Sequence, residues 1–201
     1  MDPSQFLSSV DVTQPSFWIS AGSIVFNPLM WNIVARNEYR NKTIAKVLGS
    51  PLAGCYFLAF TIFTLGLLRD WLFTVALKDQ PTLPILEHLL IKIYAGLLVA
   101  VGNVLVLTSM FKLGVTGTYL GDYFGILMEE RVVGFPFNVL ENPMYFGSTM
   151  CFFGGALWSA SPAGVVLSLV VHFVYAAAIR YEGPFTTMIY QKRDESRKKA
   201  R

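Results

Sequence analysis

Long apolar runs, separated by short charged or proline-containing connections, are the feature that most constrains how this chain folds. The runs at 52–68 and 93–111 are each long enough to cross a bilayer as a helix, and a helix satisfies its own backbone polar groups in lipid. The chain is 54% hydrophobic and only 14% charged, with a mean hydropathy of +0.50. These values exclude an ordinary soluble domain and predict an all-α integral membrane protein that folds as a single small multi-helix bundle.

The first and last apolar regions differ from these two spans. The run at 17–35 has Asn27 and Pro28 at its centre, and proline removes a helix hydrogen bond while asparagine adds a polar group. We therefore expect a kinked or re-entrant N-terminal helix. The region 146–179 is split by Ser161-Pro162 into two stretches that are each slightly short for a span, so we expect a C-terminal helical hairpin.

A polar, glycine-rich and aromatic segment at 112–145, here called the polar island, lies between the apolar runs. Its charged side chains would each cost a few kcal/mol in hydrocarbon, so it must lie at a membrane surface or line a cavity. The segment 180–201 is a basic tail, which we expect to be mobile and cytosolic by the positive-inside rule. A cytosolic tail puts the polar island and the basic loop at 36–46 in the cytosol, and 69–92 in the lumen. A competing topology, with single spans at both ends of the chain, sends the island and the basic loop to the lumen.

Charge and ligand-forming residues exclude several function classes. The net charge of +3 is concentrated in the tail, which gives no case for nucleic-acid binding. His88 and His172 form no metal cluster, and the cysteine spacing matches neither a zinc site nor a disulfide framework. Lys198 and Lys199 are the fourth and third residues from the C-terminus, which matches a dilysine address of the endoplasmic reticulum read by a retrieval coat. The alternative is a solvated tail that is attracted to lipid.

Four strings carry a family resemblance: GTYLGDYFGIL at 117–127, ERVVGFPFNV at 130–139, NPMYFGST at 142–149 and YEGPFT at 181–186. In order and spacing they resemble the phospholipid methyltransferase family, and its fungal members most. The resemblance implies transfer of methyl groups from S-adenosylmethionine to the amine of ethanolamine phospholipids, above all the mono- and dimethyl forms, ending at phosphatidylcholine in the endoplasmic reticulum membrane. It also implies an isoprenylcysteine methyltransferase-like C-terminal half without a Rossmann domain.

The same resemblance implies where the methyl donor binds. The family's contacts are placed at a GxG in the third membrane segment, here Ala100-Val101-Gly102, and at a Glu-Glu pair, here Glu182 followed by glycine. Residues two apart project about 200° apart on a helix, so residues 100 and 102 cannot both face one ligand through their side chains. The alternative for this element is therefore that its small residues serve helix packing. Glu182 would hold the amino group of the methionine moiety by a charge-assisted hydrogen bond, or would pair with Arg180.

A third donor-binding element is suggested by Asn142-Pro143-Met144-Tyr145, which resembles the xHPxY element of the wider carboxyl methyltransferase group with Asn in place of His. Pro143 can begin a helix whose first amide groups bind an anion. The ring of Tyr145 can face a sulfonium, or can serve as an interfacial anchor. Asn142, Pro143 and Tyr145 are therefore candidates for cofactor binding.

Methyl transfer needs a neutral, aligned amine, and an alkylammonium is protonated at neutral pH. The candidate proton acceptors are Asp122 and Glu129, followed by Glu130 and Glu141. The alternative for Asp122 is a turn-forming residue beside glycine. The alternative for Glu129 and Glu130 is a charged helix face at the surface. The candidates for substrate binding are Tyr123, Arg131, Arg180 and Lys112. For the three basic residues the alternative is that the side chain extends from a helix end to the membrane surface.

Two other function classes stay open. A membrane protein-carboxyl methyltransferase would use the same donor, although the string at 117–127 argues against it. A non-enzymatic membrane protein that binds lipid is the second alternative, because each of the two donor motifs matches the family at only one of its residues.

Overall fold

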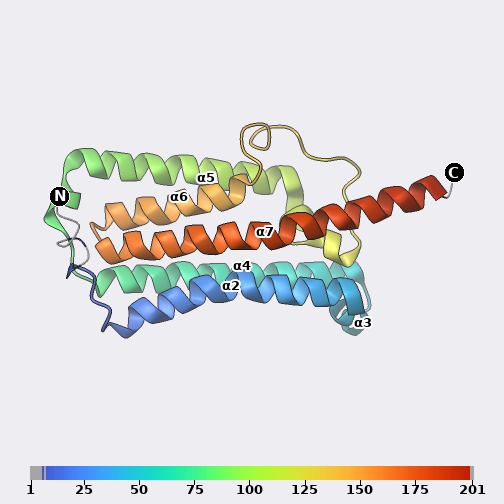
Figure 1. Cartoon of the computed structure of the whole chain (residues 1–201), viewed down its shortest axis with the longest axis horizontal. Coiled ribbons are helices and arrows are strands. Elements are labelled where there is room, and N and C mark those ends of the chain that lie inside the picture. The colour runs from blue at the N-terminus through green and yellow to red at the C-terminus, as the bar shows by residue number, and fades with distance from the viewer. Residues whose placement is uncertain (1–5, 7, 200–201) are drawn as a thin grey trace.

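A computed structural model describes residues 6 and 8–199, and it shows long helices lying side by side (Figure 1). Proline is the first residue of α2, α4, α6 and α7. The N–H at this position makes no hydrogen bond within a helix, so proline, which lacks it, costs nothing there. In chain order the elements are α2 (Pro15–Asn41), α3 (Thr43–Leu48), α4 (Pro51–Lys78), the 3₁₀ turn η1 (Pro84–Glu87), α5 (Leu89–Thr118), the 3₁₀ turn η2 (Gly121–Phe124), α6 (Pro143–Trp158) and α7 (Pro162–Lys199).

Within the described residues, α2, α4, α5 and α7 are long and apolar enough to cross a membrane. The shorter α6 has 16 residues and packs against α5 and α7. The predicted all-α membrane fold is therefore confirmed, and the chain is a multi-pass membrane protein. The likeness to isoprenylcysteine methyltransferases stays a prediction.

The N-terminal helix is longer than the apolar run at 17–35. α2 continues through Pro28, and its 27 residues extend about 40 Å, enough for a crossing. The kinked or re-entrant form expected for 17–35 stays a prediction. The side-chain amide of Asn27 donates to the carbonyl oxygen of Leu65 in α4 at 3.0 Å, so this polar group is satisfied inside the bundle.

The predicted C-terminal hairpin is present, with α6 and α7 joined by residues 159–161. α7, however, does not end at 179 but continues as a helix to Lys199, so the expected mobile tail is a helical extension. The guanidinium of Arg193 donates to the carbonyl oxygen of Met128 at 2.6 Å and joins this extension to the polar island. The dilysine retrieval signal includes the last four positions of the chain, and two of these, 200 and 201, lie outside the described residues.

α5 and α6 approach each other closely through glycine. A Cβ atom added to Gly102 would lie 2.5 Å from the carbonyl oxygen of Gly147, and one added to Gly147 would lie 2.6 Å from that of Gly102. Only glycine fits at both positions, which is the small-residue packing common between membrane helices.

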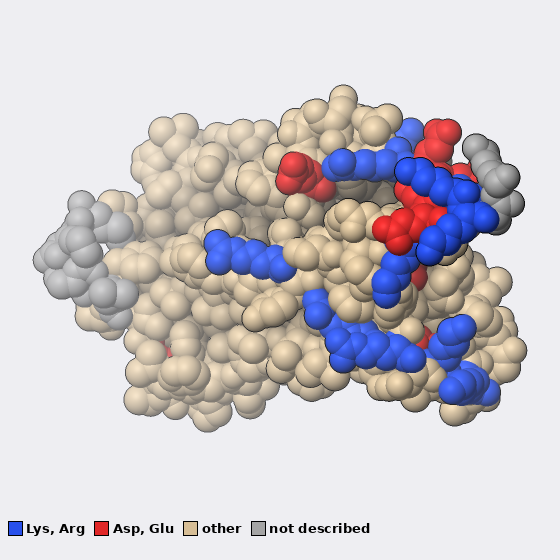
Figure 2. All heavy atoms as spheres, turned by 45° about the vertical axis from the view of Figure 1, so that its right-hand side comes forward, with Lys and Arg blue, Asp and Glu red and all other residues tan. Residues whose placement is uncertain are grey.

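The polar island and the two basic segments lie at one end of the bundle (Figure 1). Gly114, with φ +64°, breaks the regular path of α5, and the chain then turns through η2 into the loop at 125–142. The basic segment 36–46, the polar island and the extension of α7 lie together at the right of Figure 1, and η1 lies at the opposite end. Figure 2 shows Lys, Arg, Asp and Glu side chains gathered at this end of the visible surface.

Candidate active site

A cavity of about 520 Å³ lies at the polar end of the bundle. Most of its wall is apolar, and a few polar groups converge on it from different helices, which is the usual character of a ligand site. α2, α4, α5, α6, α7 and η2 all contribute to the wall. The polar side chains that the argument uses are Trp31, Arg69, Asp70, Asp122, Tyr145, Tyr175, Glu182 and Thr186.

Glu182 is the most strongly oriented acid in this wall. Its Oε1 accepts hydrogen bonds from Trp31 Nε1 and Asn32 Nδ2, both at 2.7 Å, and its Oε2 accepts one from the Tyr145 hydroxyl at 2.6 Å. A carboxylate has about four acceptor positions. Three are used here, so one position on Oε2 remains for a ligand.

Among the residues that the structure describes, no basic side chain forms an ion pair with Glu182. The ion pairs formed by the described residues are Arg69 with Asp70 and Arg193 with Asp194, so the proposed pair with Arg180 is not present. Arg180 is exposed on α7. A partly buried carboxylate with hydrogen bonds but no counter-ion fits a cationic ligand.

Asp122 is another acid of the cavity wall, which also includes Asp70 and the predicted candidate Glu141. It lies in η2, and its Oδ2 accepts a hydrogen bond from the Thr186 hydroxyl at 3.1 Å. Thr186 is four residues after Glu182, one turn further along the same face of α7. The two carboxylates therefore face one cavity from neighbouring levels, and both favour a positive charge inside it.

The start of α6 also lies in the wall, through Asn142, Pro143 and Tyr145. Pro143 is the first residue of the helix, and the amide groups of the first turn have no partner within it. These residues, predicted from one short motif, therefore lie together with Glu182 beside the cavity.

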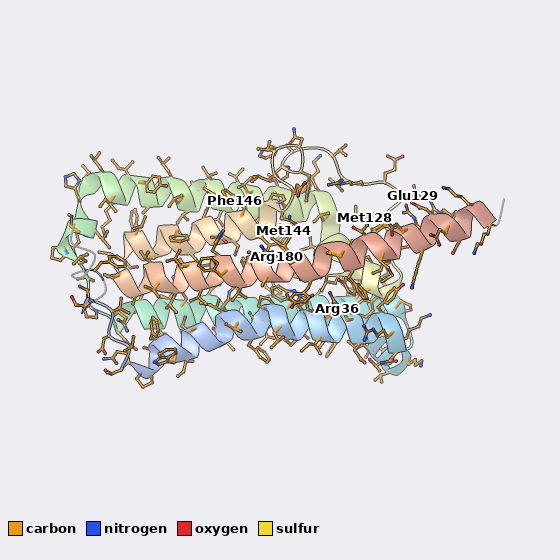
Figure 3. The ribbon with its side chains drawn as sticks, in the orientation of Figure 1. Arg36, Met128, Glu129, Met144, Phe146 and Arg180 are labelled. Carbon is orange, nitrogen blue, oxygen red and sulfur yellow. The ribbon has the colours of Figure 1, made fainter. Side chains whose placement is uncertain are left out.

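Other predicted residues lie elsewhere. Glu129 and Arg131 are exposed on the loop, and Figure 3 shows Glu129 well separated from Arg180. Tyr123 is 2% exposed, and its ring stacks on that of Phe185 with 5.0 Å between the centroids. The structure does not bring these four side chains into the cavity wall.

The predicted Ala100-Val101-Gly102 element lies in the middle of α5. Ala100 and Val101 are exposed, and Gly102 is buried against α6. The cavity wall on α5 begins at Val106, one turn nearer the polar end. The structure therefore does not bring this element to Glu182, and its contact with the donor stays a prediction.

Sequence reasoning missed four residues of the site. Trp31 and Asn32 belong to the string WNIVAR at 31–36, and polar groups inside an apolar run could have indicated a functional position there. Thr186 belongs to YEGPFT at 181–186, but no local sequence feature connects it to Asp122. Arg69 directly follows the apolar run at 52–68, and α4 continues past it to Lys78.

Comparison with known proteins agrees with this site. A family model described as phospholipid methyltransferase matches residues 90–193. The chain is 56% identical to the phosphatidyl-N-methylethanolamine N-methyltransferase of Neurospora crassa, over 95% of this chain and 90% of that protein. The Saccharomyces cerevisiae protein of the same name is 52% identical, over 96% and 94%. The phosphatidylethanolamine N-methyltransferase of Rattus norvegicus is 47% identical, over 94% and 96%. No solved structure matches the chain. With a family match of this extent and relatives similar over nearly their whole length, the chain belongs to the phospholipid methyltransferase family.

Proposed function

We propose that this protein transfers methyl groups from S-adenosylmethionine to the amine of ethanolamine phospholipids, mainly the mono- and dimethyl forms, to give phosphatidylcholine. The names of the fungal relatives support the acceptor class. The observation that carries the proposal is the arrangement around Glu182, where three donors fix a carboxylate that faces the cavity and forms no ion pair within the described part of the chain.

Glu182 would hold the ammonium group of the methionine moiety at its remaining Oε2 position. Tyr145 lies beside it and places an aromatic ring near the expected positive charge. The amide groups at the start of α6, next to Asn142 and Pro143, are free to bind a carboxylate. S-adenosylmethionine supplies an activated methyl group on its sulfonium, and these residues hold and orient it.

Asp122 would accept the proton that the amine must lose. It lines the cavity and also an open groove of about 460 Å³, whose wall includes Lys192 and Arg193 of the α7 extension. A carboxylate between the two spaces can take a proton from the cavity and release it to water. Thr186 fixes one of its oxygens for this role.

The position of the cavity suits a lipid amine and a soluble donor. The polar end of the bundle carries the basic segment 36–46 and the basic extension of α7, and the positive-inside rule favours the cytosol for such an end. We therefore propose a cytosolic site and a cytosolic C-terminus. A location in the endoplasmic reticulum, with retrieval through Lys198 and Lys199, belongs to the same proposal.

The test uses membranes from cells that express the chain, incubated with S-adenosylmethionine labelled on its methyl group. We expect label in phosphatidylcholine and its methylated precursors, increasing when dimethyl-phosphatidylethanolamine is added. Label in protein would indicate a carboxyl methyltransferase instead, and label in neither would indicate a protein without this activity. A Glu182→Gln variant should incorporate much less label, whereas Glu87→Gln, an exposed change at the opposite end of the bundle, should not.

A further inference from the structure

Arg69 is a charged residue in the interior of a membrane helix. It lies well inside α4, and its side chain is only 11% exposed. A charged side chain at such a position costs several kcal/mol, and in membrane proteins it usually faces a functional cavity. Arg69 lines the same cavity as Glu182 and Asp122. The role proposed above for those two acids leaves this cation without a function.

The contacts of Arg69 leave part of its guanidinium available. Its Nε and Nη2 donate to a single oxygen of Asp70, at 3.0 and 2.8 Å, and its Nη1 donates to the Tyr175 hydroxyl. The guanidinium also lies over the ring of Phe152, 4.9 Å from its centroid. Among the described residues these bonds use three of its five N–H groups. One N–H on each terminal nitrogen therefore remains for a ligand oxygen.

Asp70 does not occupy the position of that ligand. It accepts along the Nε–Nη2 edge, and its side chain is 55% exposed. Its negative charge offsets that of Arg69 while no ligand is present, which lowers the cost of keeping a cation within the membrane. Tyr175, whose hydroxyl also lies 3.4 Å from that of Ser148, fixes the other side of the guanidinium.

The positions along α7 match the order of groups in a phospholipid. Tyr175, which holds Arg69, precedes Glu182 by seven residues, about 10 Å along the helix, and Thr186, which holds Asp122, is about 6 Å further on. From the polar end inward the cavity wall therefore presents Asp122, then Glu182, and then the guanidinium of Arg69 with its partner Asp70. A phospholipid in the adjacent leaflet presents its amine outermost and its phosphate deeper, next to the glycerol.

The wall near Arg69 is suited to acyl chains. Gly66 lies one turn before Asp70 on α4, and a Cβ atom added there would meet nothing within 4 Å. Phe63 and Leu67, which also line the cavity, are 52% and 56% exposed on the surface of the bundle. The cavity is therefore continuous with an apolar surface that faces the bilayer, beside the only guanidinium in its described wall.

We infer that Arg69 is the oxyanion-binding residue for the phosphodiester of the lipid substrate, and that it sets the enzyme's selectivity for phospholipids over other lipid amines. The inference rests on the proposed function. Arg69 binds the phosphodiester through the two remaining N–H groups, with the acyl chains along Phe63 and Leu67 and the amine toward Asp122. The carboxylate of the methyl donor has the same oxyanion chemistry, so the test separates the two sources.

The test compares two acceptors in mixed micelles: dimethyl-phosphatidylethanolamine, and a diacyl lipid with the same dimethylamine but no phosphate. For Arg69→Gln we expect KM for the phospholipid to rise about tenfold or more, which corresponds to loss of a charge-assisted hydrogen bond. We expect KM for the phosphate-free lipid and KM for S-adenosylmethionine to stay within about twofold of wild type, as their binding does not use this guanidinium. Arg69→Lys keeps the charge without the planar fork, and should give an intermediate KM for the phospholipid.

A structural role for Arg69 predicts a different result. Gly154→Ala acts on the contact between α5 and α6 outside the cavity wall, where the added Cβ would lie 2.8 Å from the carbonyl oxygen of Ala95. It should lower the thermal midpoint while leaving the ratio of the two lipid KM values unchanged. The inference is overturned if Gly154→Ala reproduces the effect of Arg69→Gln, if the donor KM rises instead, or if both lipid KM values change equally. Should Arg69→Gln not fold, the same ratio measured for Arg69→Lys decides. A wild-type protein that labels no lipid would instead refute the proposed function itself.

Discussion

Replacing Glu182 with glutamine tests the donor site with little change of shape. Glutamine keeps one oxygen for the N–H groups of Trp31 and Asn32, and its amide can donate to the Tyr145 hydroxyl. What it loses is the charge and the remaining acceptor position on Oε2. A hydrogen bond between charged groups contributes about 1.5–3 kcal/mol, so the affinity for S-adenosylmethionine should fall about 10- to 150-fold.

The assay is equilibrium binding of labelled S-adenosylmethionine to purified protein in detergent without lipid substrate, so that no turnover occurs. Glu87→Gln provides the matched control, because the same chemical change is made at an exposed position of η1. Trp31→Phe removes one of the three donors but keeps the carboxylate, and should weaken binding less than Glu182→Gln. If Glu182→Gln bound the donor as tightly as the control, the assignment of this carboxylate to the donor's ammonium would be refuted.

Three further predictions follow from the geometry. Asp122→Asn should lower kcat about 100-fold or more while donor affinity stays near the wild-type value, because only proton acceptance is lost; equal losses in kcat and donor binding would contradict this role. Gly102→Ala should destabilise the protein by about 1–3 kcal/mol in detergent melting, since its Cβ would lie 2.5 Å from a backbone oxygen of α6, whereas Gly96→Ala, with its nearest neighbour at 3.8 Å, should be close to neutral. Cysteine placed at the exposed Val47 should react with an impermeant maleimide from the cytosol, and cysteine at Ile85 only from the lumen. Labelling of both from one side would refute the proposed topology.

The parts of the fold that sequence predicts well are those set by local composition. The spans at 52–68 and 93–111 lie inside α4 and α5, and Pro162 begins α7 as a hairpin requires. What sequence does not predict is the partner of a polar residue when that partner is distant in the chain. Nothing near Asn27 in the sequence indicates that the carbonyl oxygen of Leu65 accepts its hydrogen bond, and nothing near Arg69 indicates its contact with Tyr175.

The candidate site shows the same limit. Glu182 was found through a family motif, and Tyr145 through a short string that precedes a helix. Trp31 and Asn32, about 150 positions away, could be recognised as polar residues in an apolar run, but their convergence on one carboxylate follows from the packing of α2 against α7. The Ala100-Val101-Gly102 motif is ambiguous in the sequence, because small residues serve both the approach of a ligand and the packing of helices. In the structure Gly102 packs against α6.

One short part of α7 sets the positions of both acids. Glu182 contacts the cavity directly, and Thr186, one turn later on the same face, holds Asp122. Pro184 lies between them and removes one helix hydrogen bond from this turn. Arg36 of α2 reinforces the weakened turn, because its guanidinium donates to the carbonyl oxygen of Tyr181 at 2.6 Å and lies over the ring of Phe185, 4.6 Å from the centroid. The position of Thr186 relative to Glu182 is thus fixed within one helix that α2 supports, and the hydrogen bond from Thr186 ties Asp122 of η2 to that helix.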